Sequence, residues 1–162
     1  MTADMRYSMQ DCKSSPFSVS LTLLRGRMMK EQLQEIRIFE NYRIILMEPG
    51  HSLFETEVTE HALNIYGHPH GGYLYTLCDT SAGMAAISTG VNVVTLRADM
   101  SYIRSAAKGD ILRVEGIAIH NGRTTKVVES SVYDQQGKLI CKGTFTMYVT
   151  GERKSEPDEK QA

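Results

Sequence analysis

Two hydrophobic patterns divide the chain near residue 90. Residues 71–88 are rich in leucine, alanine and other small residues and nearly free of charge, which predicts a buried helix that ends at Gly90. Residues 94–102 instead alternate between apolar and polar side chains, as expected of a strand with one face in a core. The apolar positions of that strand are Val94, Leu96, Ala98, Met100 and Tyr102, and the polar ones are Thr95, Arg97, Asp99 and Ser101.

Weaker patterns predict the other elements. A helix is expected where apolar residues share one face, at Met29, Leu33, Ile36 and Phe39. Further strands are expected at residues 42–47, 53–59, 111–120, 124–133 and 139–149. A Pro49-Gly50 turn separates the first two of these strands, and Asn121-Gly122, a strong hairpin signal, separates the third and fourth.

This order of elements predicts an α+β fold in which a curved antiparallel sheet wraps around one long central helix. One sheet on one helix leaves an apolar face uncovered, so we expect at least a homodimer. Residues 1–27 show no sustained periodicity and are expected to form a flexible leader. Residues 28–150 would form the folded domain, and residues 151–162 a disordered polar tail.

Composition narrows the classes of function. The chain has 162 residues, enough for one domain, and a net charge of −1, which argues against a nucleic-acid or anionic-membrane partner. No stretch reaches 18 consecutive apolar residues, so no membrane span is expected. The three cysteines are widely spaced and form no CxxC pair, which indicates free thiols in a reducing compartment and predicts a cytoplasmic protein. The histidines match no common zinc spacing, so no metal is expected.

One carboxylate is isolated within the predicted buried helix. Asp79 is the only formally charged residue in the range 61–96, and burying a charge without a purpose is costly. Gly71 and Gly72, just where the helix begins, leave backbone N–H groups bare at its positive end, where they can bind an oxyanion. An oxyanion site and a carboxylate on one helix are two parts of an acyl-transfer active site. The structural alternatives are a hydrogen bond that Asp79 accepts from a nearby hydroxyl, such as Thr76 or Thr80, and a tight turn at the glycines.

The same residues form a recognisable motif. Its fixed positions are Asn64, Gly67, His70, Gly71, Gly72 and Asp79. This spacing, over a matching order of helix and strands in residues 30–150, resembles the hotdog-fold thioesterases of the phenylacetic-acid-degradation (PaaI-like) type. The resemblance implies cleavage of an acyl-CoA thioester without metal or cofactor. It also implies a homodimer with active sites at the subunit interface, often paired into a homotetramer.

The resemblance also assigns roles to individual residues. Asp79 would act as general base or nucleophile, and the Gly71 N–H would polarise the thioester carbonyl. Asn64 and His70 would orient water or the thioester, although each could serve only its own loop. Thr95 lies near the position of a strand hydroxyl that some members use. The predicted substrate-binding residues are Gly72, Tyr73, Thr95, Arg104 and Arg123, the two arginines as partners for the CoA phosphates.

Two other functions remain open at the level of sequence. A hydratase or dehydratase of acyl thioesters would use a different histidine-and-acid motif, which the sequence lacks. A non-catalytic module that binds acyl-CoA would share the fold without the chemistry. The sequence does not name the acyl group, because aromatic, medium-chain and short-chain thioesters all fit the motif.

Overall fold

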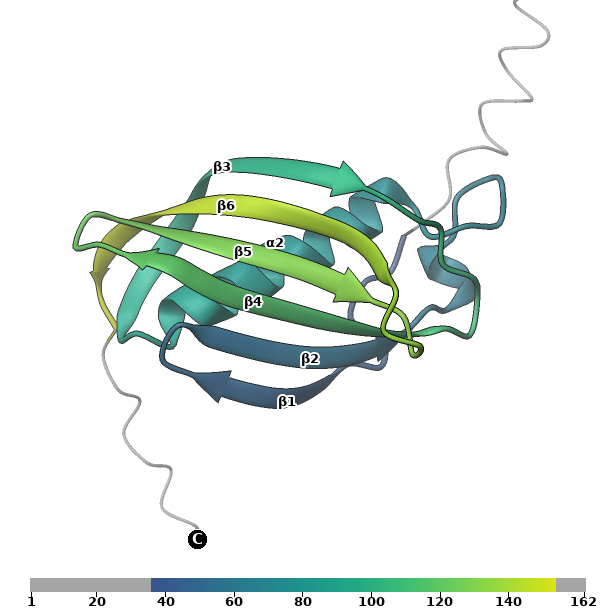
Figure 1. The fold of residues 1–162 in the computed structure, drawn as a ribbon, viewed down its shortest axis with the longest axis horizontal. Helices are drawn as coiled ribbons and strands as arrows, with labels where there is room; N and C mark the ends of the chain where they lie inside the picture. The colour runs from purple at the N-terminus through teal and green to yellow at the C-terminus, as the bar shows by residue number, and fades with distance from the viewer. Residues whose placement is uncertain (1–35, 154–162) are drawn as a thin grey trace, which may run out of the picture. The chain divides into compact units, whose positions relative to one another are not determined.

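The computed structural model describes residues 36–153. The elements in this range are β1 (Arg43–Glu48), β2 (His51–Glu57), the short 3-10 helix η1 (Glu60–Ala62), α2 (Gly71–Ile87), β3 (Val91–Tyr102), β4 (Ile111–Asn121), β5 (Thr125–Tyr133) and β6 (Leu139–Glu152). The strands form one six-stranded sheet in the order β1-β2-β4-β5-β6-β3, with every neighbouring pair antiparallel. In Figure 1 the curved sheet lies across α2, with β3 at one edge and β1 at the other. The predicted α+β architecture, a long helix covered by an antiparallel sheet, is therefore confirmed.

The core lies between the sheet and the buried side of α2. The largest fully buried side chains include Tyr73 and Leu77 from the helix and Phe54 and Phe145 from the sheet. The helix has buried residues in each of its turns, as its nearly uncharged sequence predicted. This packing fixes both the height and the rotation of α2 over the sheet.

The helix approaches the sheet most closely at Gly116 of β4. A Cβ at this position would lie 2.5 Å from Ser81 Oγ and 2.7 Å from the Ser81 carbonyl oxygen, so no larger residue fits without movement. The Ser52 hydroxyl donates a hydrogen bond of 2.8 Å to the same carbonyl, and the Ser130 hydroxyl lies 3.3 Å from Ser81 Oγ. A small buried polar cluster therefore joins the middle of α2 to β2 and β5, on either side of the close contact with β4.

Strand β3 departs from the alternation that the sequence predicts. Thr95 pairs with Met147 and Arg97 with Thr146, so Leu96 is an extra residue in a β-bulge. The bulge reverses the faces on its N-terminal side: Val94 and Leu96 are exposed, at 54% and 65%, instead of sharing the core face with Ala98. Thr95, which the alternation placed on the opposite face, is turned toward α2.

The structure also corrects the expected helix near residue 36. Ile36 and Phe39 belong to no helix, and the rest of that prediction lies outside the described residues. Arg37 donates its backbone N–H to the His61 carbonyl at 3.2 Å, so contacts with the segment after β2 replace helical hydrogen bonds. The predicted leader, residues 1–27, also lies outside the described range, and β6 continues through the first two residues of the predicted tail. Within residues 36–153, no helix has the length and hydropathy needed to cross a membrane.

Candidate active site

The first turn of α2 presents a free backbone donor. His70 is the N-cap residue, with an extended backbone, and its Nδ1 accepts a hydrogen bond of 2.8 Å from the Gly72 N–H. Nδ1 therefore lacks a hydrogen, and the neutral ring carries its proton on Nε2, an assignment that follows from this hydrogen bond. Within residues 36–153, the Gly71 N–H makes no hydrogen bond. This N–H lies at the positive end of a 17-residue helix and is available to an oxyanion.

A cavity of about 400 Å³ opens beside this helix end. Asn64, Gly71, Tyr102 and Arg104 all line it, together with apolar atoms of Leu74. The Tyr102 hydroxyl donates a hydrogen bond of 3.0 Å to the Gly71 carbonyl oxygen. The structure thus brings together two of the predicted catalytic residues and one predicted substrate-binding arginine.

Asn64 shapes the loop that leads into α2. Its Oδ1 accepts hydrogen bonds from the backbone N–H groups of Tyr66, at 2.9 Å, and of His68, at 3.2 Å. The loop closes further through the Asn64 N–H, which donates to the His68 carbonyl at 2.7 Å. Asn64 therefore does stabilise its own loop, and it does so through Oδ1, which leaves its side-chain NH₂ available to a ligand.

Asp79 lies on the same helix, where β3 crosses it. Its carboxylate is partly exposed, and Oδ1 accepts a hydrogen bond of 2.7 Å from the Thr95 hydroxyl. The bulge at Leu96 makes this contact possible, because it turns Thr95 toward the helix. Thr76, a threonine of the same helix that was considered as a partner for Asp79, does not bond it, because its hydroxyl donates to the Gly72 carbonyl.

The thiol next to Asp79 has a structural position. Cys78 is fully buried, with its Sγ 3.9 Å from Sγ of Cys141 on β6. Contact with Cys78 and burial raise the pKa of Cys141 well above its usual range. Both thiols are fully buried and in contact with each other, so Cys78 and Cys141 are suited to the core and not to the chemistry.

The Gly71 N–H and the Asp79 carboxylate lie too far apart to act on one bond within a single chain. They are eight residues apart along α2, which corresponds to about 12 Å at 1.5 Å per residue. A tetrahedral intermediate needs its oxyanion donor and its base or nucleophile each within about 3 Å of the reacting group. One chain therefore holds two half-sites.

The other predicted residues are distributed unevenly. The Gly72 N–H already donates to His70 Nδ1 and is not free for substrate. The Tyr73 ring lies in the core with 1% exposure, where burial raises the pKa of its hydroxyl. Arg104 is exposed and donates one guanidinium hydrogen bond of 3.0 Å to the Leu139 carbonyl. Arg123 is exposed in the β4–β5 turn, at the end of the sheet where β3 begins, whereas Arg104 follows the end of β3. The structure does not bring the two arginines together within one chain.

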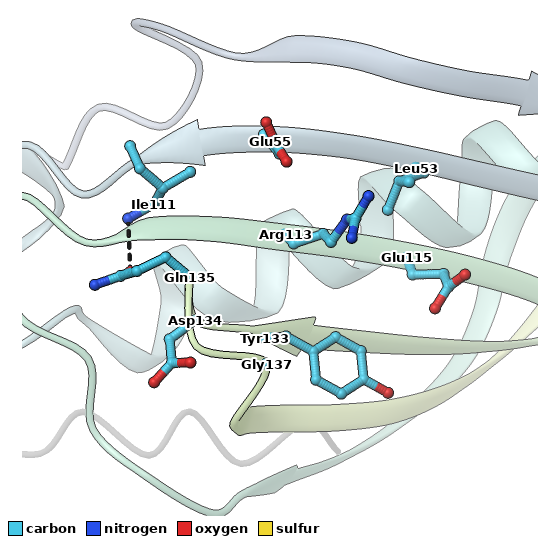
Figure 2. A pocket seen from close by; sticks show the side chains of 9 residues that line it. All are labelled: Leu53, Glu55, Ile111, Arg113, Glu115, Tyr133, Asp134, Gln135 and Gly137. Carbon is cyan, nitrogen blue, oxygen red and sulfur yellow. Dashed lines mark hydrogen bonds between the residues drawn. The ribbon is translucent and has the colours of Figure 1, made fainter.

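A larger cavity, of about 480 Å³, lies on the face of the sheet opposite to α2. Figure 2 shows that its side chains project from β2, β4 and β5 and from the turn after β5, with Arg113 between Glu55 and Glu115. None of the predicted site residues lines this cavity, so its size does not make it the active site. In residues 36–153, no three His, Cys, Asp or Glu side chains are grouped so as to hold a metal ion.

Comparison with known proteins agrees with this geometry. A family model described as the thioesterase superfamily matches residues 66–141. The acyl-coenzyme A thioesterase PaaI of Escherichia coli is 31% identical over 98 residues, which cover 60% of this chain and 70% of that protein. The 1,4-dihydroxy-2-naphthoyl-CoA hydrolase of Listeria monocytogenes is 30% identical over 114 residues, which cover 68% of this chain and 92% of that protein.

Two solved structures match this chain over nearly their own full length and over three quarters of this chain. A hypothetical thioesterase of Streptococcus pneumoniae, crystallised with coenzyme A, has a TM-score of 0.74 and 44% identity, covering 75% of this chain and 98% of its own. An aspartate-to-alanine and a threonine-to-alanine variant of that protein have also been solved, each with a TM-score of 0.73 and 42% identity. A Streptococcus mutans protein bound to acetyl-CoA has a TM-score of 0.70 and 48% identity, covering 75% of this chain and 98% of its own. The chain belongs to the thioesterase superfamily, and its fold is the hotdog fold of that family.

Proposed function

We propose that this protein hydrolyses an acyl-CoA thioester to the free acid and CoA. The observation that carries the proposal is the pair of half-sites on α2, the unpartnered Gly71 N–H and the Asp79 carboxylate that accepts from Thr95. Thioester hydrolysis needs both a donor for the developing oxyanion and a group that activates water or attacks directly. The CoA-containing structures of two similar proteins support CoA as the carrier of the acyl group.

In the proposed reaction, the thioester carbonyl oxygen accepts from the Gly71 N–H. Asp79 takes a proton from water as the water oxygen attacks the carbonyl carbon, and Thr95 holds the carboxylate in place. Collapse of the tetrahedral intermediate breaks the C–S bond, and the proton passes to the CoA thiolate. Direct attack by Asp79 is the alternative first step: its carboxylate oxygen would bond the acyl carbon and the C–S bond would break, which forms an anhydride and releases the CoA thiolate. Water would then hydrolyse the anhydride to the free acid and regenerate Asp79.

The spacing of two solved variants in a similar protein supports the importance of this pair. The aspartate and the threonine that were replaced in the Streptococcus pneumoniae protein are sixteen residues apart. Asp79 and Thr95 are separated by the same 16 residues. The match favours an acid and a hydroxyl that act together.

The separation of the half-sites supports a homodimer with active sites at the subunit interface. In such a dimer, the Gly71 N–H of one subunit would work with the Asp79 carboxylate of the other. Strand β3 is an edge strand, pairs only with β6 among the described strands, and exposes the apolar residues Val94 and Leu96. An open apolar edge invites a second copy. Pairing of two dimers into a tetramer follows from the family resemblance alone.

The remaining roles complete the proposal. Asn64 would orient water or the thioester through its free NH₂, and His70 through Nε2–H. Gly72, Arg104 and Arg123 are proposed to contact substrate, the arginines through the CoA phosphates, whereas the burial of Tyr73 in the core argues against a substrate contact by its ring. The reaction is proposed to need no metal or cofactor. Two buried free thiols, Cys78 and Cys141, fit a reducing, cytoplasmic setting.

The test is to measure the release of free CoA from short, medium, long and aryl acyl-CoAs. Chromatography detects the CoA, so that protein thiols do not interfere. We expect wild type to turn over at least one thioester, and Asp79→Asn to reduce kcat by about 10²–10⁴-fold. Asp99→Asn, at an exposed aspartate on β3, is the matched control and should keep wild-type activity. Tight acyl-CoA binding without turnover in wild type would contradict hydrolysis and favour the non-catalytic module. Conversion of an enoyl-CoA without CoA release would favour a hydratase.

A further inference from the structure

The peptide between Gly71 and Gly72 is held at both of its ends by side chains. Its carbonyl oxygen accepts from the Tyr102 hydroxyl at 3.0 Å, and its N–H donates to His70 Nδ1 at 2.8 Å. The peptide before His70 is also fixed, because the His70 N–H donates to the Ala62 carbonyl at 2.8 Å. The unpartnered Gly71 N–H belongs to the peptide between these two, whose own carbonyl, that of His70, accepts from the Leu74 N–H at 3.1 Å.

Two consecutive glycines need such restraint. Glycine has the largest range of accessible backbone conformations, so a Gly-Gly pair at a helix end can redirect its N–H groups at little energetic cost. Fixed donors are worth far more to an oxyanion than mobile ones, because they need no reorganisation during the reaction. The direction of the Gly71 N–H therefore depends on what holds its neighbouring peptides as well as on the Leu74 hydrogen bond to its own peptide.

Tyr102 restrains this helix end from a different element of the fold. A Cβ built on Gly71 would lie 3.6–3.8 Å from the ring and hydroxyl of Tyr102, so the tyrosine lies directly beside this glycine. Tyr102 is the last residue of β3 and pairs with the buried Cys141 of β6, which anchors its backbone in the sheet. Partial burial raises the pKa of Tyr102, so the hydroxyl stays protonated and able to donate throughout the neutral range.

We propose that Tyr102 is a positioning residue, which holds the Gly71–Gly72 peptide so that the neighbouring Gly71 N–H keeps a fixed direction toward the thioester oxygen. This inference rests on the proposed hydrolysis. It also gives β3 two roles on α2, since Thr95 holds the carboxylate and Tyr102 holds the oxyanion donor.

The direct test is Tyr102→Phe, which keeps the ring and removes only the hydroxyl. Removal of a whole oxyanion donor typically lowers kcat by about 10²–10³-fold, so a donor that is only loosened should cost roughly 10-fold in kcat with little change in KM. The matched control is Tyr148→Phe, because Tyr148 is also an exposed strand tyrosine, at 45% against 53% for Tyr102, and its hydroxyl has no hydrogen bond within residues 36–153. The control should retain wild-type kcat.

A spectroscopic measurement separates positioning from a general loss of structure. In the Asp79→Asn background, the carbonyl stretch of a bound ¹³C-labelled acyl-CoA should lie below that of the free thioester. Adding Tyr102→Phe should move the stretch back toward the free value, whereas adding Tyr148→Phe should not. An unchanged kcat and an unchanged stretch in Tyr102→Phe would overturn the inference while leaving the proposed hydrolysis intact. If wild type turns over no thioester, the proposed hydrolysis fails, and the stretch of bound acyl-CoA alone decides whether Tyr102 acts on the donor.

Discussion

The two half-sites on α2 are held in opposite ways. At the start of the helix the reactive group is a backbone N–H, and side chains from outside restrain it: His70 from the preceding loop and Tyr102 from β3. In the middle of the helix the reactive group is a side chain, Asp79, and the backbone beneath it is fixed by packing on the sheet. The first half-site therefore depends on a few hydrogen bonds, whereas the second depends on the Thr95 hydrogen bond and also on how well the helix fits the sheet.

This difference predicts whether a substitution should affect catalysis or stability. Changes near the helix start should alter catalysis more than stability, because that end is exposed and its contacts are local. Changes beneath the helix should alter stability first, since the Ser52, Ser81 and Ser130 hydroxyls and Gly116 lie in a dry, close-packed interface.

The largest loss of activity is expected from a substitution that prevents two subunits from bringing their half-sites together. Leu96→Arg places a charge at a 65% exposed position on the open edge of β3. We expect the variant to be monomeric by sedimentation velocity and to release no CoA, because no single chain can complete the site. Ile119→Arg, at 58% exposure on β4, is the control and should remain a dimer with activity. A Leu96→Arg monomer with full activity would contradict the shared site, and a Leu96→Arg dimer with full activity would contradict the edge of β3 as the interface.

The next largest effect should come from the hydroxyl that holds the carboxylate. Thr95→Val keeps the shape of the side chain and removes the 2.7 Å hydrogen bond to Asp79. Hydrogen bonds to charged groups are worth about 1.5–3 kcal/mol, so kcat should fall by roughly 10- to 100-fold. Thr95→Ser should restore most of the loss in the same assay. Equal activity of the valine and serine variants would mean that the hydroxyl has no part in the reaction.

How much of this could be predicted from the sequence differs between the two half-sites. The glycines, His70 and Asp79 were recognisable because their spacing is local and the helix that carries them has a strong hydrophobic signature. The orientation of Thr95 was not predictable from alternation, because the bulge at Leu96 arises from pairing with β6. The Tyr102 contact was missed for a similar reason: it joins residues 31 apart, and no local pattern marks it.

The same reasoning explains the error near residue 36. Helical spacing of apolar residues is a weak signal over a short segment, and tertiary contacts override it readily. Glu40, for example, accepts from the Thr59 hydroxyl at 2.7 Å and lies 3.2 Å from His61 Nδ1, which ties this segment to the end of β2. In contrast, the seventeen residues of α2 and the long strands β4 to β6 carried patterns long enough to predict them.

Measurements of unfolding free energy should distinguish the side of α2 that packs on the sheet from the side that is open. Gly116→Ala puts a methyl group where the nearest atoms are 2.5–2.9 Å away, and overpacking of this kind costs about 1–3 kcal/mol. Gly83→Ala, on the helix itself, meets nothing within 4 Å and should gain about 0.5–1 kcal/mol from helix propensity. Both free energies of unfolding are measured by denaturant titration. A destabilised Gly83→Ala would instead show that a second subunit packs on that side of the helix.

The smallest effect should divide the two roles of Asn64. Asn64→Ala removes the acceptor of two loop hydrogen bonds, each worth about 0.5–1.5 kcal/mol net, so thermal stability and activity should both fall. Asn64→Asp keeps that acceptor oxygen and replaces the NH₂ group by a second, negatively charged oxygen, so stability should hold while kcat/KM falls. The reason is that the loop uses the oxygen, whereas a substrate or water would use the NH₂. If the aspartate variant is as active as wild type, Asn64 serves the loop alone, and the helix-start half-site consists of the Gly71 N–H and the residues that hold it.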